Sequence, residues 1–171
     1  RKVFRPDQPL FVLTPPPMKA RLLQELGFDA VVEQAFTREF ASQSAETFVT
    51  EILEGALGIS CAVTGFDFHF GKDRRGTPAY LMAAGEHHGF GVSLVEAFHD
   101  ESNVIVSSSR IRTLLEGGAP EEAAGLLGYR FTVESEVIGG QQLGRTLGFP
   151  TANMKLPSET ALKEGVYAVR F

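Results

Sequence analysis

The chain has 171 residues, of which 43% are hydrophobic and 22% charged, and it contains 14 Phe and no Trp. This composition is typical of a folded globular protein and excludes a disordered one. The net charge of −5 and the pI of about 5.4 argue against a nucleic-acid-binding surface that covers the whole protein.

Up to residue 128 the sequence alternates between predicted helices and strands. Three prolines at 15–17 and Gly27 bracket the first helix, because proline favours a helix start and glycine a helix end. A short buried strand is expected at 30–32. Ser44 caps a second helix, whose expected buried side chains are Phe48, Val49, Ile52, Leu53 and Leu57.

The alternation continues to the end of this part of the chain. The remaining elements are strands at 60–64, 90–95 and 104–106, and helices at 77–89, 107–118 and 120–128. Strands that alternate with helices predict an α/β fold with a parallel, Rossmann-like sheet.

After residue 128 no helical spacing returns. Residues 131–138 alternate as a strand does, and 166–171 is strand-like again. We therefore expect an α/β domain over 1–128 and the beginning of an all-β domain over 129–171. Because the last run is cut short and the chain does not begin with Met, we also expect a piece of a longer protein.

Several features argue against other classes of protein. Cys61 is the only cysteine, so an intrachain disulfide is excluded, and its apolar neighbours predict a buried packing group. No His or Cys partners stand at metal-binding spacing, which argues against a zinc site. No apolar run reaches the ~18 residues of a membrane span, and no signal peptide is visible. We expect a cytoplasmic protein without nucleic-acid or membrane partners, and the oligomeric state stays open.

The first candidate site is the strand-to-helix junction at Ser107, Ser108 and Ser109. Backbone N–H groups and the positive end of the helix dipole attract anions at such a junction. Arg112 follows Ser109 by three positions and shares its side of the helix, whereas Arg110 points elsewhere. This chemistry suits phosphate groups. The same residues also fit plain helix capping by serine, with arginines on the surface.

The second candidate site is the loop at 65–71. The preceding strand carries this loop to the carboxyl edge of the sheet, where open α/β folds bind ligands. Phe66, Phe68 and Phe70 alternate with Asp67, so we expect the rings on one side, where they could wall a flat ring. Asp67 could then accept from a ribityl hydroxyl or an N–H. The alternative is three core phenylalanines and a loop-stabilising aspartate.

The third candidate site is the segment at 144–153. Gly144 lets the backbone approach a phosphate closely, and Pro150 stiffens the chain. If Thr151 and Asn153 are extended, they share a face. A hydroxyl and an amide oxygen are hard ligands that suit Mg²⁺ or a polyphosphate. The alternative is a β-turn followed by an ordinary edge strand.

Together these segments resemble the bacterial bifunctional FAD synthetases, in which riboflavin kinase is joined to FMN adenylyltransferase. Residues 65–71 with Arg75 and Gly76 are similar to the family's Gly-x-Asp-Phe-x-Phe-Gly…Arg-x-Gly stretch. Residues 106–112 are similar to its Ile-Ser-Ser-Thr-x-Ile-Arg motif, and 144–153 to its Gly-Arg-x-Leu-Gly-Phe-Pro-Thr-Ala-Asn motif. The resemblance covers essentially the whole chain.

The resemblance implies a nucleotidylyltransferase domain followed by a riboflavin-kinase β-barrel. It implies ATP, Mg²⁺ and the flavins riboflavin, FMN and FAD as cofactors, substrates and products. The residues implied to bind ATP in the first domain are Ser107, Ser108, Ser109 and Arg112. Those implied to bind the flavin are Asp67, Phe68, Phe70 and Arg75. Those implied to bind ATP and Mg²⁺ in the kinase domain are Gly144, Arg145, Pro150, Thr151 and Asn153, with Thr151 and Asn153 as the metal ligands.

The sequence also departs from the family pattern. Neither the His-x-Gly-His motif of the first domain nor the catalytic glutamate of the kinase is found in these residues. Ser109 replaces a threonine, and Tyr129 begins a stretch that replaces Arg-Pro-Tyr. We therefore expect that this chain by itself makes neither FMN nor FAD. Two alternatives stay open, namely a non-catalytic nucleotide- or flavin-binding chain and a nucleotidylyltransferase for another phosphorylated substrate.

Overall fold

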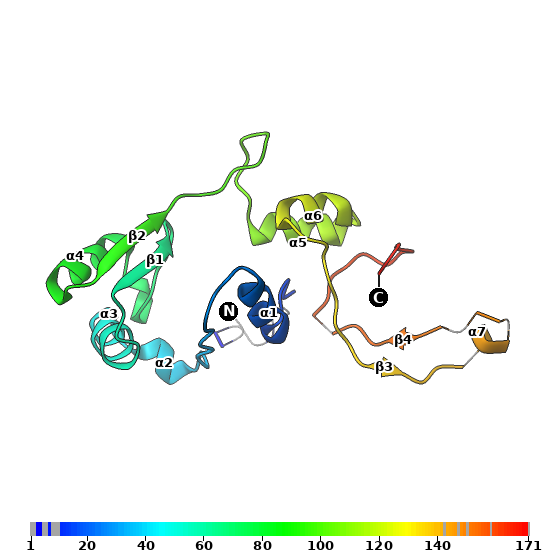
Figure 1. Ribbon diagram of the computed structural model, residues 1–171, viewed down its shortest axis with the longest axis horizontal. Coiled ribbons are helices and arrows are strands. Elements are labelled where there is room, and N and C mark those ends of the chain that lie inside the picture. Colours follow the sequence, from blue (N-terminus) through cyan, green and yellow to red (C-terminus); the bar gives the residue numbers. More distant parts are fainter. Residues whose placement is uncertain are drawn as a thin grey trace. The chain divides into compact units, whose positions relative to one another are not determined.

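The structure is a computed structural model that describes residues 3–4, 7, 11–141, 143–146, 148–149, 151–157 and 159–170, without the side chains of Leu143 and Arg145. The chain divides into two compact units (Figure 1). The first unit consists of Arg1–Asp7 and Val31–Ile105, and the second of Gln8–Ala30 and Val106–Phe171.

The first unit contains two short helices that begin at hydroxyl side chains. α2 (Arg38–Ser42) follows Thr37, whose Oγ1 accepts a backbone N–H of the first turn at 3.1 Å. α3 (Ala45–Thr47) follows Ser44, whose Oγ accepts a backbone N–H at 2.9 Å. The predicted cap at Ser44 is confirmed, since its oxygen satisfies a donor that has no partner within the helix.

α3 runs directly into η1 (Phe48–Ala56), which is a π-helix. Val49 is 1% exposed, and Phe48 and Leu53 pack against the same core, as predicted. Leu57 lies just past the end of η1 and is 48% exposed, so its predicted burial is wrong. A π-helix bonds each residue to the fifth one along the chain, and the α-helical spacing used for that prediction no longer holds.

A parallel pair of strands forms the sheet of this unit. β1 (Cys61–Gly65) and β2 (Gly91–Val95) are connected through α4 (Pro78–His88), as the alternating pattern predicted. Thr77 caps the start of α4, and Gly89 ends it with a φ of +81°, a left-handed conformation that glycine adopts without a Cβ clash.

The two faces of this sheet differ in burial. Ala62 lies opposite Val92, and both pack against the core of the unit. That core consists of Ala45, Val49, Phe70, Leu81 and Phe90. Val63 alternates to the other face and is 69% exposed. Cys61 shares this face with Val63 and is exposed, so its predicted burial is wrong.

Two predicted strands are not observed. Residues 30–32 form no strand. At 104–106 only Ile105 forms a bridge, which is antiparallel to His99. The carboxylate of Asp100 closes a tight turn between them, because it accepts two backbone N–H groups, each at 2.9 Å. A short apolar run becomes a strand only where a partner strand lies beside it, and the sequence does not specify that partner.

The second unit contains the remaining predicted helices. α1 (Pro16–Glu25), α5 (Ser108–Gly117) and α6 (Pro120–Leu127) lie where the proline, serine and glycine signals predicted them. α5 and α6 pack against each other (Figure 1). They end at Gly118 and Gly128, which both have positive φ. The core of this unit consists of Phe11, Leu13, Ile111, Leu115 and Ala123.

The end of the chain differs most from its prediction. β3 (Val137–Ile138) and β4 (Asn153–Met154) form an antiparallel pair, so the strand expected over 131–138 is reduced to its last two residues. α7 (Leu143–Thr146) is a helical turn where none was expected, and 166–170 forms no strand. Both sheets found in the described part have two strands and neither is closed, so the barrel is not confirmed.

Candidate functional site

The serines expected to bind ATP stand at the first turn of α5. The hydroxyl of Ser107 accepts the N–H of Arg110 at 3.3 Å, so Ser107 caps the helix. Ser108 and Ser109 are exposed, and α5 has no acidic residue in its first turn. The positive end of the helix dipole is therefore not neutralised by a carboxylate of α5 itself, and two hydroxyls stand beside it.

Arg112 is held by the main chain of the segment that precedes α1. Its Nε donates to the carbonyl oxygen of Phe11 at 2.6 Å, and its side chain is half-buried. Phe11 is itself a core residue, and its ring meets that of Phe131 edge-on at 5.8 Å. A guanidinium has five N–H donors, and this bond uses one of them. The contact joins residues 101 positions apart, so no spacing rule could have predicted it.

Asp67 is exposed and lies in a turn directly after β1. Its backbone carbonyl oxygen lies 2.8 Å from Nδ1 of His69. The chain turns here, and the phenylalanines of this loop differ in burial. Phe66 is 53% exposed, whereas Phe70 is 7% exposed and belongs to the core. The alternative interpretation as a core residue holds for Phe70, and the expected contact of these rings with a flat ligand stays a prediction.

Phe68 is the second aromatic residue expected to contact the flavin. Its ring stacks on that of Phe70 with centroids 5.4 Å apart and an interplanar angle of 22°. Phe48 and Tyr80 contact Phe70 at 5.1 Å and 5.9 Å. Phe68 is half-buried, so within this pair it is the ring that retains exposed surface.

Arg75 lies in a tight loop that is closed by two backbone hydrogen bonds of 3.1 Å and 2.9 Å between Phe70 and Gly76. Within the loop, Asp73 and Arg74 have φ angles of +56° and +58°. Left-handed conformations of residues other than glycine cost about 1–3 kcal/mol each, and the surrounding structure must enforce them. The loop holds the side chain of Arg75 exposed to solvent.

In the third segment, Gly144 is enclosed by its neighbours. Its carbonyl oxygen accepts the N–H of Phe149 at 2.7 Å. A methyl group on Gly144 would overlap the carbonyl oxygen of Phe149 and would lie 3.2 Å from Oγ1 of Thr151. Only glycine fits here, because the chain folds back against its own α-carbon.

Thr151 and Asn153 are both exposed, and a methyl group on Gly140 would overlap the amide of Asn153. Their hydroxyl and amide oxygens suit Mg²⁺ as part of a larger oxygen set. No group of three His, Cys, Asp or Glu side chains that could hold a metal ion occurs among the described residues. Pro150 and the side chain of Arg145 lie outside the described part of the chain.

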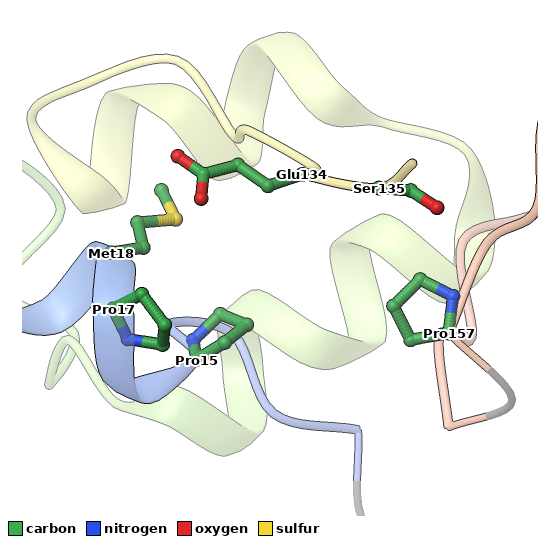
Figure 2. Close-up of a pocket in the computed structure, with 6 residues that line it drawn as sticks. All are labelled: Pro15, Pro17, Met18, Glu134, Ser135 and Pro157. Carbon is green, nitrogen blue, oxygen red and sulfur yellow. The ribbon is translucent and has the colours of Figure 1, made fainter. Parts of the chain in front are cut away.

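A cavity of about 430 Å³ in the second unit contains none of the predicted site residues. Figure 2 shows its lining, which is formed by Pro15, Pro17, Met18, Glu134, Ser135 and Pro157. Its polar side chains already have partners: the carboxylate of Glu134 pairs with Arg21 at 2.7 Å, and the hydroxyl of Ser135 donates to the carbonyl of Lys155 at 2.5 Å. The sequence pattern at Pro15 and Pro17 predicts only a helix start.

Comparison with known families gives two matches in chain order. The FAD synthetase family matches residues 1–110, and the riboflavin kinase family matches residues 127–171. The chain belongs to the FAD synthetase family. The resemblance found in the three motifs is thereby confirmed.

Curated relatives carry both activities in their names. Bifunctional riboflavin kinase/FMN adenylyltransferase of Escherichia coli K12 is 36% identical over 98% of this chain and 53% of the relative. The protein of the same name from Listeria monocytogenes is 39% identical over 93% of this chain and 50% of the relative. That of Haemophilus influenzae is 38% identical over 89% of this chain and 49% of the relative. The chain thus spans about half the length of these relatives.

A solved structure from Streptococcus pneumoniae, named a macrolide-efflux protein, has 30% sequence identity to this chain and a TM-score of 0.75. The similarity covers 90% of this FAD synthetase family chain and 48% of the other. In the described residues, no helix has both the length and the apolar composition needed to cross a membrane.

Proposed function

We propose that this chain contributes to both steps of FAD biosynthesis, the phosphorylation of riboflavin to FMN and the adenylylation of FMN to FAD. The observation that carries the proposal is the succession of an FAD synthetase match and a riboflavin kinase match within one chain. The names of the curated relatives support it, because each combines the two activities. The riboflavin kinase match also disfavours a nucleotidylyltransferase for some other phosphorylated substrate.

We assign the parallel pair β1 and β2 to a nucleotidylyltransferase domain over 1–128, and β3 and β4 to the beginning of a riboflavin-kinase barrel over 129–171. The parallel pairing through a helical connection supports the first assignment. The antiparallel pairing and the riboflavin kinase match over 127–171 support the second.

In the adenylylation step, a phosphate oxygen of FMN attacks the α-phosphorus of ATP, and pyrophosphate leaves. Such a reaction is accelerated by positioning the reactants and by neutralising charge on the phosphates. We assign the phosphates of ATP to the first turn of α5, where Ser108 and Ser109 offer hydroxyls and Arg112 offers guanidinium donors. Ser107 contributes through the helix cap, because its hydroxyl already accepts from Arg110.

We assign the flavin to the loop after β1. Asp67 is an exposed acceptor for a ribityl hydroxyl or a ring N–H, and Arg75 is an exposed cation for the FMN phosphate. Phe68 offers ring surface, whereas Phe70 supports Phe68 from the core through their stacking contact. This division of roles follows from burial, since a core ring cannot also lie against a substrate.

In the phosphorylation step, the terminal hydroxyl of riboflavin attacks the γ-phosphorus of ATP, and ADP leaves. We assign the nucleotide to 144–153, with the close turn at Gly144 bringing backbone toward the phosphates. Thr151 and Asn153 would hold Mg²⁺, which offsets negative charge on the phosphates when it is bound. The two exposed oxygens support this assignment.

A second candidate function is binding of nucleotide or flavin without catalysis by this chain. The observation that favours it is that the sequence contains no His-x-Gly-His motif. We therefore expect the chain to bind ligands but not to turn them over.

Titration calorimetry with MgATP, FMN and riboflavin, each alone, tests whether the assigned sites bind their ligands. A chromatographic assay for FMN and FAD tests whether the chain converts them. We expect MgATP and FMN to bind, Ser108→Ala to weaken MgATP, and Asp67→Asn to weaken FMN alone. Ser102→Ala, which changes an exposed serine outside both loops, is the matched control. Absence of binding by all three ligands would refute the proposed function, and formation of FAD would refute the non-catalytic alternative.

A further inference from the structure

The segment at 161–167 docks on the C-terminal end of α5. The N–H of Lys163 donates to the carbonyl oxygen of Leu115 at 3.1 Å, and its Nζ donates to that of Gly117 at 3.4 Å. Ala161 and Leu162 pack against the core that contains Leu115. The carbonyl oxygen of Leu115 also accepts the N–H of Gly118 at 3.1 Å, so both donors of Lys163 add hydrogen bonds to carbonyls of the last turn of α5.

The side chain of Lys163 lies over the glycine that ends the helix. Gly118 has a φ of +83°, and a methyl group built on it would lie 2.8 Å from Cδ of Lys163. The hydroxyl of Tyr167 donates to the carbonyl of Lys163 at 2.5 Å and closes the turn from the other side. The ammonium group is thereby held next to the helix end by contacts of its stem and its own backbone.

The charge of Lys163 supplies what the last turn of α5 lacks, a basic side chain near the negative end of the helix dipole. The last turn of α5 contains no basic residue but does contain Glu116, whose charge is unfavourable at the negative end of the helix dipole. Lys163 provides from elsewhere in the chain the positive charge that helix C-termini favour. The pairing was not predictable from the sequence, because the two partners are 46 positions apart.

The other end of the same helix carries the residues assigned to the phosphates of ATP. α5 has only 10 residues, and helices this short are marginal in water without contacts from the rest of the protein. Contacts that stabilise its last turn therefore also favour the helical form of its first turn. The first turn begins within the FAD synthetase match, whereas Lys163 lies within the riboflavin kinase match.

We propose that Lys163 is a positioning residue for the nucleotide site at the start of α5, through which the riboflavin kinase segment supports adenylylation. This role rests on the proposed function of that site. Lys163 does not touch the nucleotide, since it stands at the opposite end of a helix about 15 Å long. It acts by completing the C-terminal end of α5.

The test compares MgATP affinity of the full chain with that of Lys163→Met, Lys163→Arg and the control Lys155→Met, by calorimetry. Methionine retains the apolar stem over Gly118 and removes only the charge, whereas arginine restores the charge. We expect Lys163→Met to raise the dissociation constant about two- to fivefold, as a charge at a helix end can. Arginine at this position and the control should match the wild type.

Salt separates this role from a merely structural one. The dissociation constant of Lys163→Met for MgATP, divided by that of the wild type, should fall toward one as salt rises from about 0.1 M to about 1 M. Over this range the Debye length falls from about 10 Å to about 3 Å, so the effect of the charge is screened. Amide exchange of α5 without ligand should quicken in Lys163→Met and not in Lys163→Arg. Equal affinities of wild type and Lys163→Met, or a ratio independent of salt, would overturn the positioning role. A wild-type chain that binds no MgATP would refute the nucleotide site itself, and the positioning role with it.

Discussion

Leu115 belongs to α5 and is fully buried in the core of the second unit, at 0% exposure. In Leu115→Ala the apolar atoms that touch this core are lost, and the cavity left behind can close only in part. We expect the substitution to lower the free energy of unfolding by about 3–5 kcal/mol, the range measured for such sites. A domain is stabilised by only about 5–15 kcal/mol, so this is a large share of the total.

Urea denaturation followed by far-UV circular dichroism measures this loss, and amide exchange with mass spectrometry locates it. We expect α5 and α6 to lose protection first, since their contact includes Leu115 and the fully buried Ala123. The matched control is Leu26→Ala, because Leu26 is 76% exposed and should cost no more than about 0.5 kcal/mol. MgATP affinity should fall in Leu115→Ala and not in the control.

The burial of Leu115 would be contradicted if Leu115→Ala lowered the free energy of unfolding by less than about 1 kcal/mol, or by no more than the control does. Leu81→Ala provides an internal comparison, because Leu81 is 1% exposed in the core of the first unit. It should cost a similar free energy but expose the amides of α4 rather than those of α5.

Three further substitutions test local features of the fold by the same denaturation assay. Ser107→Ala removes the oxygen that accepts from Arg110 and should cost about 1 kcal/mol, whereas Ser109→Ala should cost less; equal losses would argue against the cap. Gly71→Ala should cost at least about 1 kcal/mol, because φ is +69° and a methyl group would overlap the backbone of Ala45; an unchanged midpoint would exclude that close approach. Gln43→Leu should stabilise the chain by about 1 kcal/mol, because Oε1 is buried without a hydrogen-bond partner in the described part of the chain; a loss of stability would indicate that this oxygen is satisfied.

Helix positions were predictable because their signals are local. α6 begins at Pro120 and ends before Gly128, and α4 follows the cap at Thr77, as the sequence pattern indicated. A hydroxyl that caps a first turn or a glycine that adopts positive φ acts within a few residues, so the pattern alone is sufficient.

Strands and burial were less predictable because they depend on partners distant in the sequence. Residues 30–32 and 104–106 resemble strands in composition, but in the described part of the chain 30–32 forms no strand and only Ile105 forms a bridge, to His99. Cys61 lies on the face of β1 that does not pack on the core. The short helix α7 lies in a glycine-rich segment where the sequence indicated only a turn.

By itself the sequence determined the family of the chain, the ends of most of its predicted helices and the three motifs to which its proposed chemistry is assigned, because these depend on residue type and short spacing. Only the tertiary structure decided which side chains those motifs can use. In the structure Phe70 is buried in the core, and the hydroxyl of Ser107 caps its own helix. Arg112 donates to the carbonyl oxygen of Phe11, and Lys163 lies at the C-terminal end of α5. Such contacts form between residues far apart in the chain, and no local pattern encodes them.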